Sequence, residues 1–288
     1  MDIAIDIGGS KIALAIAVKR APHKYHKISL NTHNPQNTLL ELYDFIEENQ
    51  KFYGEVRNIV LAAAPNIDPS GVVSRWPNCP QWEGVNFVES LSQLVSGEIV
   101  WCDDGVASTI ADIQHFNSKS FMHIVIGTGL GGSFYINGKV FAQPELGHQI
   151  VKPEGKTCVC KQKGCLQAYV SAGTLVQVIN NGGTDAVSQW LESAAKKLAI
   201  FVYNLTNMLK LDLSLVSGGL IKQVPELIER TNVYLSEMVQ QSKGCAPLLM
   251  LSPNIDNAPL AGALYLLEEL QTVGTKSELL SQCQIWRW

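Results

Sequence analysis

The chain has 288 residues and a net charge of −4 at pH 7, with 46% hydrophobic and 17% charged residues. This length can bury one large core or two modest ones. The negative charge disfavours nucleic acid as a partner, and the lack of an apolar run of transmembrane length disfavours a membrane protein. The start M-D-I-A-I-D-I lacks the basic region of a secretory signal, and the scattered cysteines favour a reducing compartment, so we expect a cytoplasmic protein.

The first third of the chain predicts a hairpin followed by alternating helices and strands. Residues 2–18 carry two strand-like runs around D-I-G-G-S-K, which predicts a β-hairpin. Residues 38–50 have helical periodicity, and a buried strand follows at 58–64. Residues 66–86 are rich in Pro, Gly and Asn, which predicts an irregular loop near a site. The next expected elements are a short helix at 87–95, a strand at 98–102 and a helix at 106–114.

The rest of the chain is expected to be mixed at first and then mostly helical. A strand at 121–126 runs into G-T-G-L-G-G, and a second strand is expected at 133–140. The longest amphipathic run is 187–210, and L-S-L-V-S-G-G-L predicts a strand followed by a glycine turn. The last expected helix is 258–270, while the tail to Trp288 carries no clear signal.

This order predicts two α/β lobes. We expect the first lobe to span 1–105, with the helix at 258–270 returning to it, and the second lobe to span 106–288.

A metal site is predicted in the stretch 145–167. It holds four soft ligands close together: His148, Cys158, Cys160 and Cys165. The alternative, three buried thiols and a lone surface histidine, is disfavoured because the cysteines have Gly and Lys rather than apolar neighbours. Four protein ligands leave no open position, so we expect a structural zinc that shapes a site between Glu145 and Gln167.

Two glycine turns can present backbone N–H groups to an anion. The first comprises Gly8, Gly9, Ser10 and Lys11, and the second comprises Gly127, Thr128, Gly129, Leu130, Gly131 and Gly132. The second turn is not a dinucleotide fingerprint, because a strand rather than a helix is expected after it. We expect the two turns to face each other across an interdomain cleft and to hold a polyphosphate.

Three aspartates are candidates for the chemistry. Asp6 precedes the first glycine turn, where it can hold Mg²⁺ or stabilise the turn. Asp104 lies between a strand and a helix, where it can be a helix N-cap or a general base. Asp103 beside it adds a second negative charge, which can raise the pKa of both.

Together these motifs resemble the ROK family of sugar kinases, members of the actin/hexokinase ATPase superfamily. The matching segments are D-I-G-G-S-K, D-D-G-V-A-S, G-T-G-L-G-G, E-L-G-H, C-V-C-K-Q-K-G-C and V-S-G-G-L. The cysteine loop preceded by E-x-G-H is the most specific of them. The resemblance implies an α/β, two-lobed, actin-like (ribonuclease H-like) fold with an interdomain cleft, ATP and Mg²⁺ as cofactors, a structural Zn²⁺, and a homodimer.

The resemblance also implies roles for individual residues. Asp104 would be the catalytic base and Asp6 would assist Mg²⁺. The sugar would contact Asp103, Glu145, His148, Gln167, Asn66 and Asn78. The phosphates would contact Gly8, Gly9, Ser10, Lys11, Gly127, Thr128, Gly129, Gly131 and Gly132, and the adenosine would lie near Gly218 and Gly219.

Three positions depart from the family pattern, which usually has Asn at 103, Glu at 167 and Gly at 161. We expect Lys161 to be a surface variation with a modest backbone consequence. Asp103 and Gln167 change the polarity of the sugar pocket, and a ring ammonium would match Asp103 through a charge-assisted bond. The substrate is therefore expected to be either an amino hexose, with 3-amino-3-deoxyglucose as the sharpest candidate, or a common hexose with the two changes tolerated.

The expected reaction is transfer of the γ-phosphoryl group of Mg·ATP to the 6-hydroxyl of the hexose. Alternatives are a general glucokinase or fructokinase, an N-acetylmannosamine kinase, and a sugar-binding regulator without catalysis. Repressors of the family carry a helix-turn-helix domain ahead of the kinase part, for which the position of Asp6 leaves no room in this sequence.

Overall fold

The structure is a computed structural model. It describes residues 1–9, 11–18, 24–29, 34–76, 79–117, 119–141, 144–242, 248–271 and 278–287. Two compact units are present, Met1–Ala111 with Pro259–Trp288 and Asp112–Ala258. They divide six residues after the expected boundary at 105, and the segment from Pro259 groups with the first unit. The lobe assignments and the cleft between them stay predictions.

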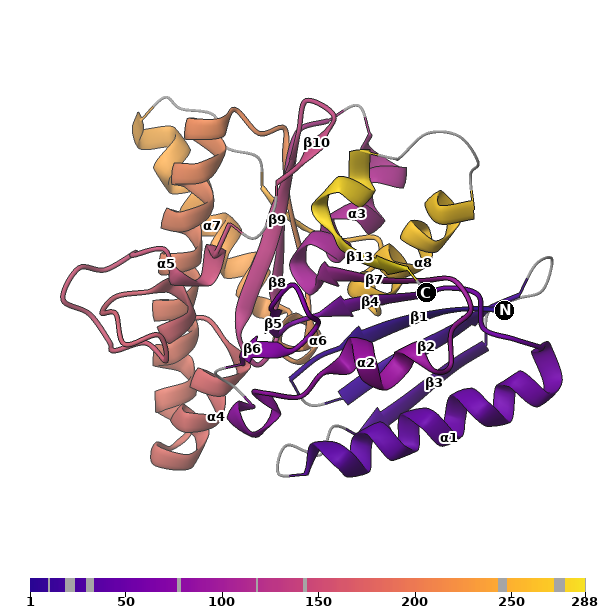
Figure 1. Ribbon diagram of the computed structural model, residues 1–288. Coiled ribbons are helices and arrows are strands. Elements are labelled where there is room, and N and C mark those ends of the chain that lie inside the picture. The colour runs from indigo at the N-terminus through magenta and orange to yellow at the C-terminus, as the bar shows by residue number, and fades with distance from the viewer. Residues whose placement is uncertain are drawn as a thin grey trace. The chain divides into compact units, whose positions relative to one another are not determined.

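The first unit is built on a six-stranded sheet of order β13-β7-β4-β1-β2-β3 (Figure 1). Strands β1, β4 and β7 run parallel, and the remaining neighbours are antiparallel. The carboxyl ends of the three parallel strands therefore meet at one edge. The strands are β1 (Asp2–Ile7), β2 (Lys11–Ala17), β3 (Lys24–Ser29), β4 (Ile59–Ala63), β7 (Glu98–Asp103) and β13 (Gln284–Arg287).

Both ends of the chain contribute to this sheet. The predicted hairpin is confirmed, because β1 and β2 pair from Asp2 with Ala17 to Ile7 with Ile12. The aromatic tail forms the edge strand β13, antiparallel to β7, and the Trp286 indole donates to the backbone oxygen of Pro69 at 3.1 Å. The tail thus packs within its own unit.

The helices of the first unit follow the apolar periodicity of the sequence. Helix α1 buries Thr38, Leu39, Leu42, Ile46 and Asn49, which lie on one face at helical spacing. It begins where the Asn34 side chain accepts from the N–H of Gln36, and it ends at Gly54. The helices that lie wholly or mostly in this unit are α1 (Pro35–Tyr53), η1 (Pro80–Trp82), α2 (Phe87–Ser92), α3 (Asp104–Phe116), α8 (Ala258–Gln271) and η4 (Glu278–Gln282). Helix α3 continues past Ala111 into the second unit.

The segment 66–86 is more ordered than its composition predicts. It forms a two-stranded sheet of β5 (Asn66–Ile67) and β6 (Val73–Arg75), followed by η1. Trp76 and Trp82 are fully buried, and Trp82 stacks on Phe87 at 5.2 Å between ring centroids. Aromatic burial holds this segment in place, while most of its described residues lie outside regular helices and strands, as expected.

The second unit is built on a five-stranded sheet of order β10-β9-β8-β11-β12. Its second strand begins at Leu130 rather than at Ser133, so Gly131 and Gly132 lie in the strand and not in the turn. Gly132 is required there, because an added Cβ would lie 2.1 Å from the backbone oxygen of His123. The strands are β8 (Phe121–Ile126), β9 (Leu130–Ile136), β10 (Lys139–Val140), β11 (Leu213–Ser217) and β12 (Leu249–Leu251).

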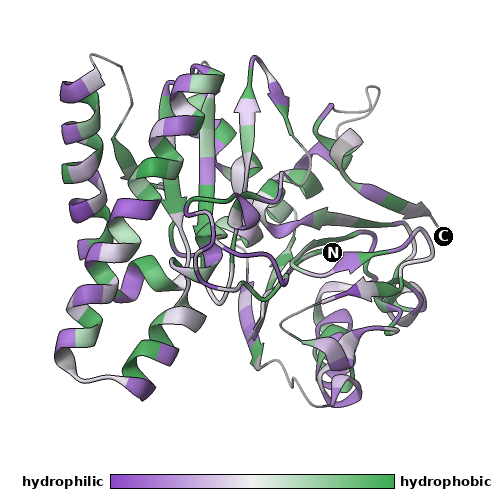
Figure 2. Ribbon diagram, turned by 90° about the vertical axis from the view of Figure 1, so that its left-hand side faces the viewer, coloured by the Kyte–Doolittle hydropathy of each residue, from purple (hydrophilic) through white to green (hydrophobic). Residues whose placement is uncertain are grey.

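Amphipathic helices complete the second unit, and α5 packs along α7. Figure 2 shows bands of hydrophobic and hydrophilic residues along the helices, while the strands are largely hydrophobic. Within the described residues, no helix combines the length and the apolar character that a membrane crossing requires. The helices are η2 (Leu146–His148), η3 (Leu166–Ala168), α4 (Ala172–Asn181), α5 (Thr184–Leu209), α6 (Gly219–Gln223) and α7 (Glu226–Ser242).

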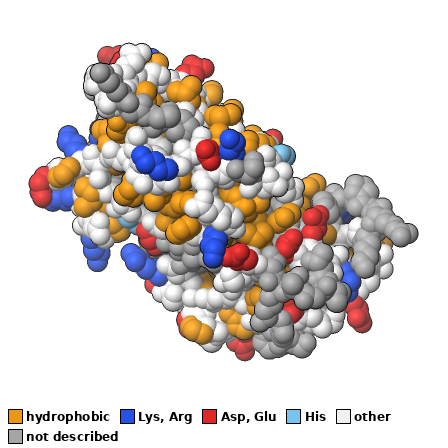
Figure 3. Space-filling model, turned by 90° about the horizontal axis from the view of Figure 1, so that it is seen from above, with side chains coloured by type: hydrophobic (Ala, Val, Ile, Leu, Met, Phe, Trp, Pro, Cys, Tyr) orange, Lys and Arg blue, Asp and Glu red, His pale blue; other side chains and the backbone are white. Residues whose placement is uncertain are grey.

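The charged side chains are mixed in sign on the face drawn in Figure 3. Lys and Arg side chains stand among acidic and apolar ones there and do not merge into one basic surface. This distribution gives no support to a nucleic-acid surface on that face.

Candidate active site and metal centre

Three carboxylates lie at the carboxyl edge of the parallel strands in the first unit. Asp6 is in β1 opposite Ala62 of β4, and Asp103 ends β7 opposite Ala63. Asp104 is the first residue of α3. The edge of an α/β sheet at the carboxyl ends of its strands is where such folds commonly bind ligands.

Asp103 caps helix α3. Its Oδ1 accepts from the backbone N–H groups of Gly105 and Val106, both at 3.0 Å. Two of the unpaired N–H groups at the helix start are thereby satisfied. The sequence left Asp104 as a candidate cap, but the capping side chain is its neighbour, and the Asp104 carboxyl is not needed for that role.

The carboxyls of Asp104 and Asp6 are tuned toward neutral pH. Burial, and then the negative charge of Asp6, raise the pKa of Asp104 from 3.8 to about 6. Burial raises the pKa of Asp6 from 3.8 to about 7, although the charge of Lys11 partly opposes this. A carboxyl with a pKa near 6 can accept a proton at neutral pH, and a divalent cation beside the pair would favour its ionised form.

The first glycine turn closes through backbone contacts. The N–H of Gly8 donates to the backbone oxygen of Lys11 at 3.0 Å, and the Cys79 thiol donates to that of Gly9 at 3.8 Å. Lys11 is exposed. Ser10 and Asn78 lie outside the described residues, and Asn66 is exposed at the start of β5.

The second glycine turn is held by Gln167. The turn is closed by the N–H of Gly127, which donates to the backbone oxygen of Gly129 at 2.9 Å. The side-chain Oε1 of Gln167 accepts from the N–H of Leu130 at 3.0 Å, directly after the turn. An added Cβ at Gly129 or Gly147 would lie 3.1 or 3.0 Å from the same Oε1, so both glycines leave room for this side chain. Gln167 therefore supports the turn, a role that the sequence did not predict.

The predicted adenosine residues form another tight turn in the second unit. Gly218 has φ of 107°, and a Cβ there would lie 2.3 Å from the backbone oxygen of Ile126. Only glycine fits this position without displacing the end of β8. Gly219 has open space beside it and begins α6.

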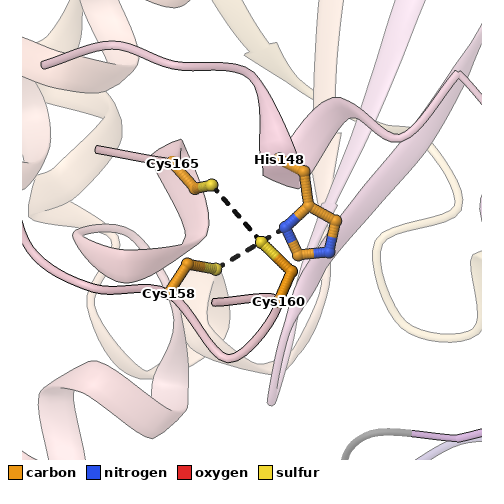
Figure 4. Close-up of side chains that lie close together, drawn as sticks. All are labelled: His148, Cys158, Cys160 and Cys165. Carbon is orange, nitrogen blue, oxygen red and sulfur yellow. Dashed lines mark hydrogen bonds between the residues drawn. The ribbon is translucent and has the colours of Figure 1, made fainter. Parts of the chain in front are cut away.

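The four predicted metal ligands converge in the second unit (Figure 4). Nδ1 of His148 lies 3.6 Å from Sγ of Cys158, and the Sγ atoms of Cys160 and Cys165 are 3.6 Å apart. All four ligand atoms lie within 4.8 Å of one another. A tetrahedral zinc requires about 3.8 Å between two sulfurs and about 3.6 Å between sulfur and nitrogen, given bonds of about 2.3 and 2.05 Å. The observed spacing fits that ion.

The surroundings of these ligands also fit a cation. Burial raises the pKa of the Cys165 thiol to about 12, so this sulfur needs a positive charge beside it to become a thiolate. Oε2 of Glu145 lies 4.0 Å from Nε2 of His148, on the ring nitrogen that points away from the cysteines. At this distance the carboxylate makes no hydrogen bond to the imidazole, but it adds negative charge beside the cluster.

The backbone of the cysteine loop turns through two left-handed residues. Lys161 has φ of 72° and Gly164 has φ of 83°, both in the left-handed region. A side chain at Gly164 would lie 1.9 Å from the backbone oxygen of Lys152. Lys161 is exposed and occupies a conformation that favours glycine, which gives the expected modest backbone consequence a physical cause.

The comparisons with known proteins agree with these motifs. The sequence model of the ROK family matches residues 2–270. A kanosamine kinase from Amycolatopsis mediterranei is 28% identical over 271 residues, which cover 85% of this chain and 88% of that protein. A glucokinase from Thermotoga maritima is 26% identical over 192 residues, covering 62% and 60% of the two chains.

The fold is shared with solved structures of the same family. A hexokinase from Thermus thermophilus superposes with a TM-score of 0.74 at 20% identity, covering 92% of this chain and 98% of that chain. A glucokinase from Streptomyces griseus, solved with glucose and AMPPNP, gives 0.71 at 19% identity, covering 92% and 98%. The chain has the actin-like fold of these kinases, and it belongs to the ROK family.

Proposed function

We propose that the protein is an ATP-dependent sugar kinase that transfers the γ-phosphoryl group to the 6-hydroxyl of a hexose. The observation that carries this proposal is Asp104, a helix-start carboxyl with a pKa of about 6 at the carboxyl edge of the parallel strands. Its neighbour Asp103 caps the helix, and the backbone hydrogen bonds that the Asp104 carboxyl accepts from Gly105 and from its own N–H do not offset the effect of burial on its pKa. A costly buried carboxyl of this kind is typical of a general base.

In this reaction the sugar oxygen bonds to the γ-phosphorus as the bond to the leaving ADP breaks. Asp104 accepts the hydroxyl proton and orients the attacking oxygen. Asp6 is the residue that would hold Mg²⁺, directly or through water, and the bound ion would neutralise charge on the phosphates. Unpaired backbone N–H groups of a glycine turn would contribute to the same neutralisation.

The metal centre has a structural part in this proposal. Zinc bound by His148, Cys158, Cys160 and Cys165 would fix the loop that carries Glu145, whose exposed carboxylate would contact the sugar hydroxyls. Gln167 would act on the phosphate side, because its Oε1 already holds Leu130 beside the second glycine turn.

We further propose an amino hexose, with 3-amino-3-deoxyglucose as the first candidate. An asparagine at position 103 would cap α3 as well as an aspartate does, so capping alone does not explain a carboxylate there. The extra negative charge favours a substrate with an ammonium group. One similar protein is named a kanosamine kinase, and kanosamine is 3-amino-3-deoxyglucose.

An ADP-release assay tests both the kinase activity and the choice of an amino hexose as substrate. The panel contains glucose, mannose, fructose, glucosamine, N-acetylmannosamine, N-acetylglucosamine and 3-amino-3-deoxyglucose. We expect the highest kcat/KM with 3-amino-3-deoxyglucose and a smaller preference for it in Asp103→Asn. If the wild type and Asp103→Asn turned over glucose equally well, the protein would be a kinase of common hexoses. A preference for N-acetylmannosamine would make it a kinase of that sugar. Sugar binding without ADP release would identify a regulator.

A further inference from the structure

A chain of buried polar contacts links helix α3 to two neighbouring strands of the second unit's sheet. Oδ2 of Asp112, on α3, lies 2.8 Å from Nδ1 of His123, on β8. Nε2 of the same imidazole lies 2.7 Å from Oγ of Ser217, the last residue of β11. The side chains of Asp112 and His123 are 0% exposed, and Ser217 is 1% exposed. Neither glycine turn contributes a side chain to this chain of contacts.

The protonation of the chain follows from its acceptors. Oδ1 of Asp112 also accepts from Oγ of Ser252 at 2.9 Å and from Nδ2 of Asn254 at 3.0 Å. Burial raises the pKa of Asp112, but the hydrogen bonds and the His123 contact outweigh this, and the net pKa is lowered. Oδ2 of Asp112 faces Nδ1 of His123, but no N–H is aligned with it, so this contact is mainly electrostatic. When the ring carries a single proton on Nδ1, Nε2 accepts from the Ser217 hydroxyl, and the NMR experiment below tests that assignment.

The order Asp–His–Ser is that of a hydrolytic triad, but the serine is buried. A nucleophile must reach a substrate carbonyl, whereas the Ser217 side chain has almost no contact with solvent. The contacts therefore hold the Ser217 side chain in place and do not prepare it for nucleophilic attack.

Ser217 is the residue directly before the turn at Gly218. Val125 of β8 pairs with Ser217, and His123 lies two residues earlier on the same strand. Its side chain reaches diagonally to the end of β11, directly before Gly218, which has no room for a side chain against Ile126. The same strand β8 leads into the second glycine turn after Ile126. The imidazole thus ties together the two strands from which both glycine turns of this unit emerge.

We propose that Asp112 and His123 are positioning residues that hold Ser217 and thereby fix the Gly218 turn for nucleotide binding. This inference rests on the proposed function in taking ATP as the nucleotide and Gly218 as part of its binding site. The carboxylate fixes the tautomer and the ring orientation, the ring fixes the Ser217 hydroxyl, and the hydroxyl fixes the end of β11. Loss of any link would leave the turn free to sample other conformations before nucleotide binds, which weakens binding.

The chain supplies a matched control for this proposal on the same strand. Ser214 of β11 is 0% exposed, and its Oγ has no hydrogen-bond partner among the residues that the structure describes. Ser214→Ala and Ser217→Ala each remove one buried hydroxyl from β11, but only the second breaks the contact with His123.

The test is calorimetric binding of a non-hydrolysable Mg·ATP analogue to the sugar-free protein. Ser217→Ala should raise the Kd about five- to tenfold, the value of one lost hydrogen bond, while Ser214→Ala leaves it within about twofold. Equal Kd values for both variants and the wild type would overturn the inference. A wild type that binds no nucleotide would instead overturn the proposed function, and this inference with it.

A second variant tests the tautomer of His123 by a readout other than nucleotide binding. Asp112→Asn replaces the carboxylate that faces Nδ1 with an amide, which is a donor or a weaker acceptor. In the wild type, ¹⁵N NMR should show the His123 proton on Nδ1. In the variant, the population with the proton on Nε2 should increase. The nucleotide Kd should rise in parallel. An unchanged ring tautomer in Asp112→Asn, or labelling of Ser217 by a fluorophosphonate in the wild type, would contradict the positioning role.

Discussion

Replacement of Asp6 by asparagine should stabilise the fold while it impairs the reaction. Burial raises the pKa of Asp6 from 3.8 to about 7, so its ionised form is disfavoured in the folded protein. The folded state therefore binds more protons than the unfolded state between those two values, and the free energy of unfolding falls as pH rises through this window. Asp6→Asn removes the carboxyl and with it this loss of stability.

The size of the effect follows from the same pKa change. At about 1.4 kcal/mol per pKa unit, the rise from 3.8 to about 7 corresponds to roughly 4 kcal/mol at pH 8.5 and roughly 2 kcal/mol at pH 5.5. These are upper limits, because Asp6 is only partly shielded from solvent. The gain in the free energy of unfolding on Asp6→Asn should be larger at pH 8.5 than at pH 5.5 by up to about 2 kcal/mol. Any effect of the substitution that does not depend on pH cancels in this comparison.

Urea unfolding of the magnesium-free protein at pH 5.5 and 8.5 measures this difference. Asp68→Asn is the control of opposite sign, because hydrogen bonds, the Ser70 hydroxyl first, lower the pKa of Asp68. Removal of Asp68 should destabilise the fold at both pH values and should not produce the gain at pH 8.5. If Asp6→Asn lowered stability equally at pH 5.5 and 8.5, the buried carboxyl would carry no such cost and the reasoning would fail.

Three further outcomes are expected. The kcat/KM for the sugar should rise with pH as Asp104 loses its proton, with the midpoint at or below its metal-free pKa of about 6 because bound Mg²⁺ favours the carboxylate. A wild-type profile that falls with pH across this range would exclude Asp104 as the base. Cys165→Ser should remove close to one equivalent of zinc, measured by metal analysis, and lower the Tm together with activity; full activity in a zinc-free protein would refute the structural role. Lys161→Gly should raise the free energy of unfolding by about 1 kcal/mol, because φ is 72° there; Lys163→Gly is the control, and an equal gain at both positions would contradict the strain argument.

The metal centre was the most predictable part of the site. Its four ligands lie within twenty residues of one another, so their spacing alone predicted that they converge, and the structure confirms this. The hairpin of β1 and β2 and the long helices were equally accessible, because apolar periodicity is a local property of the sequence. The comparisons confirm the family that these motifs indicated.

The features that the sequence did not predict depend on contacts between distant segments. Asp103 rather than Asp104 caps α3, and the choice between adjacent residues rests on backbone geometry at the helix start. Gln167 meets Leu130 only because the glycines leave space for its side chain. The contact of His123 with Ser217 requires the register of β8 and β11, which are 94 residues apart at these positions. A lone histidine in an apolar strand gave no local signal of this partner.

The central claim is that this chain is a sugar kinase with Asp104 as its base. The most direct test compares sugar-dependent ADP release by the wild type and Asp104→Asn, with sugar and nucleotide binding measured calorimetrically in the same preparations. We predict a fall in kcat of about 10²- to 10⁴-fold with both binding constants within a few fold of the wild type. Near-normal ADP release by Asp104→Asn would remove the base assignment, and a wild type that binds sugar but releases no ADP would contradict the kinase itself.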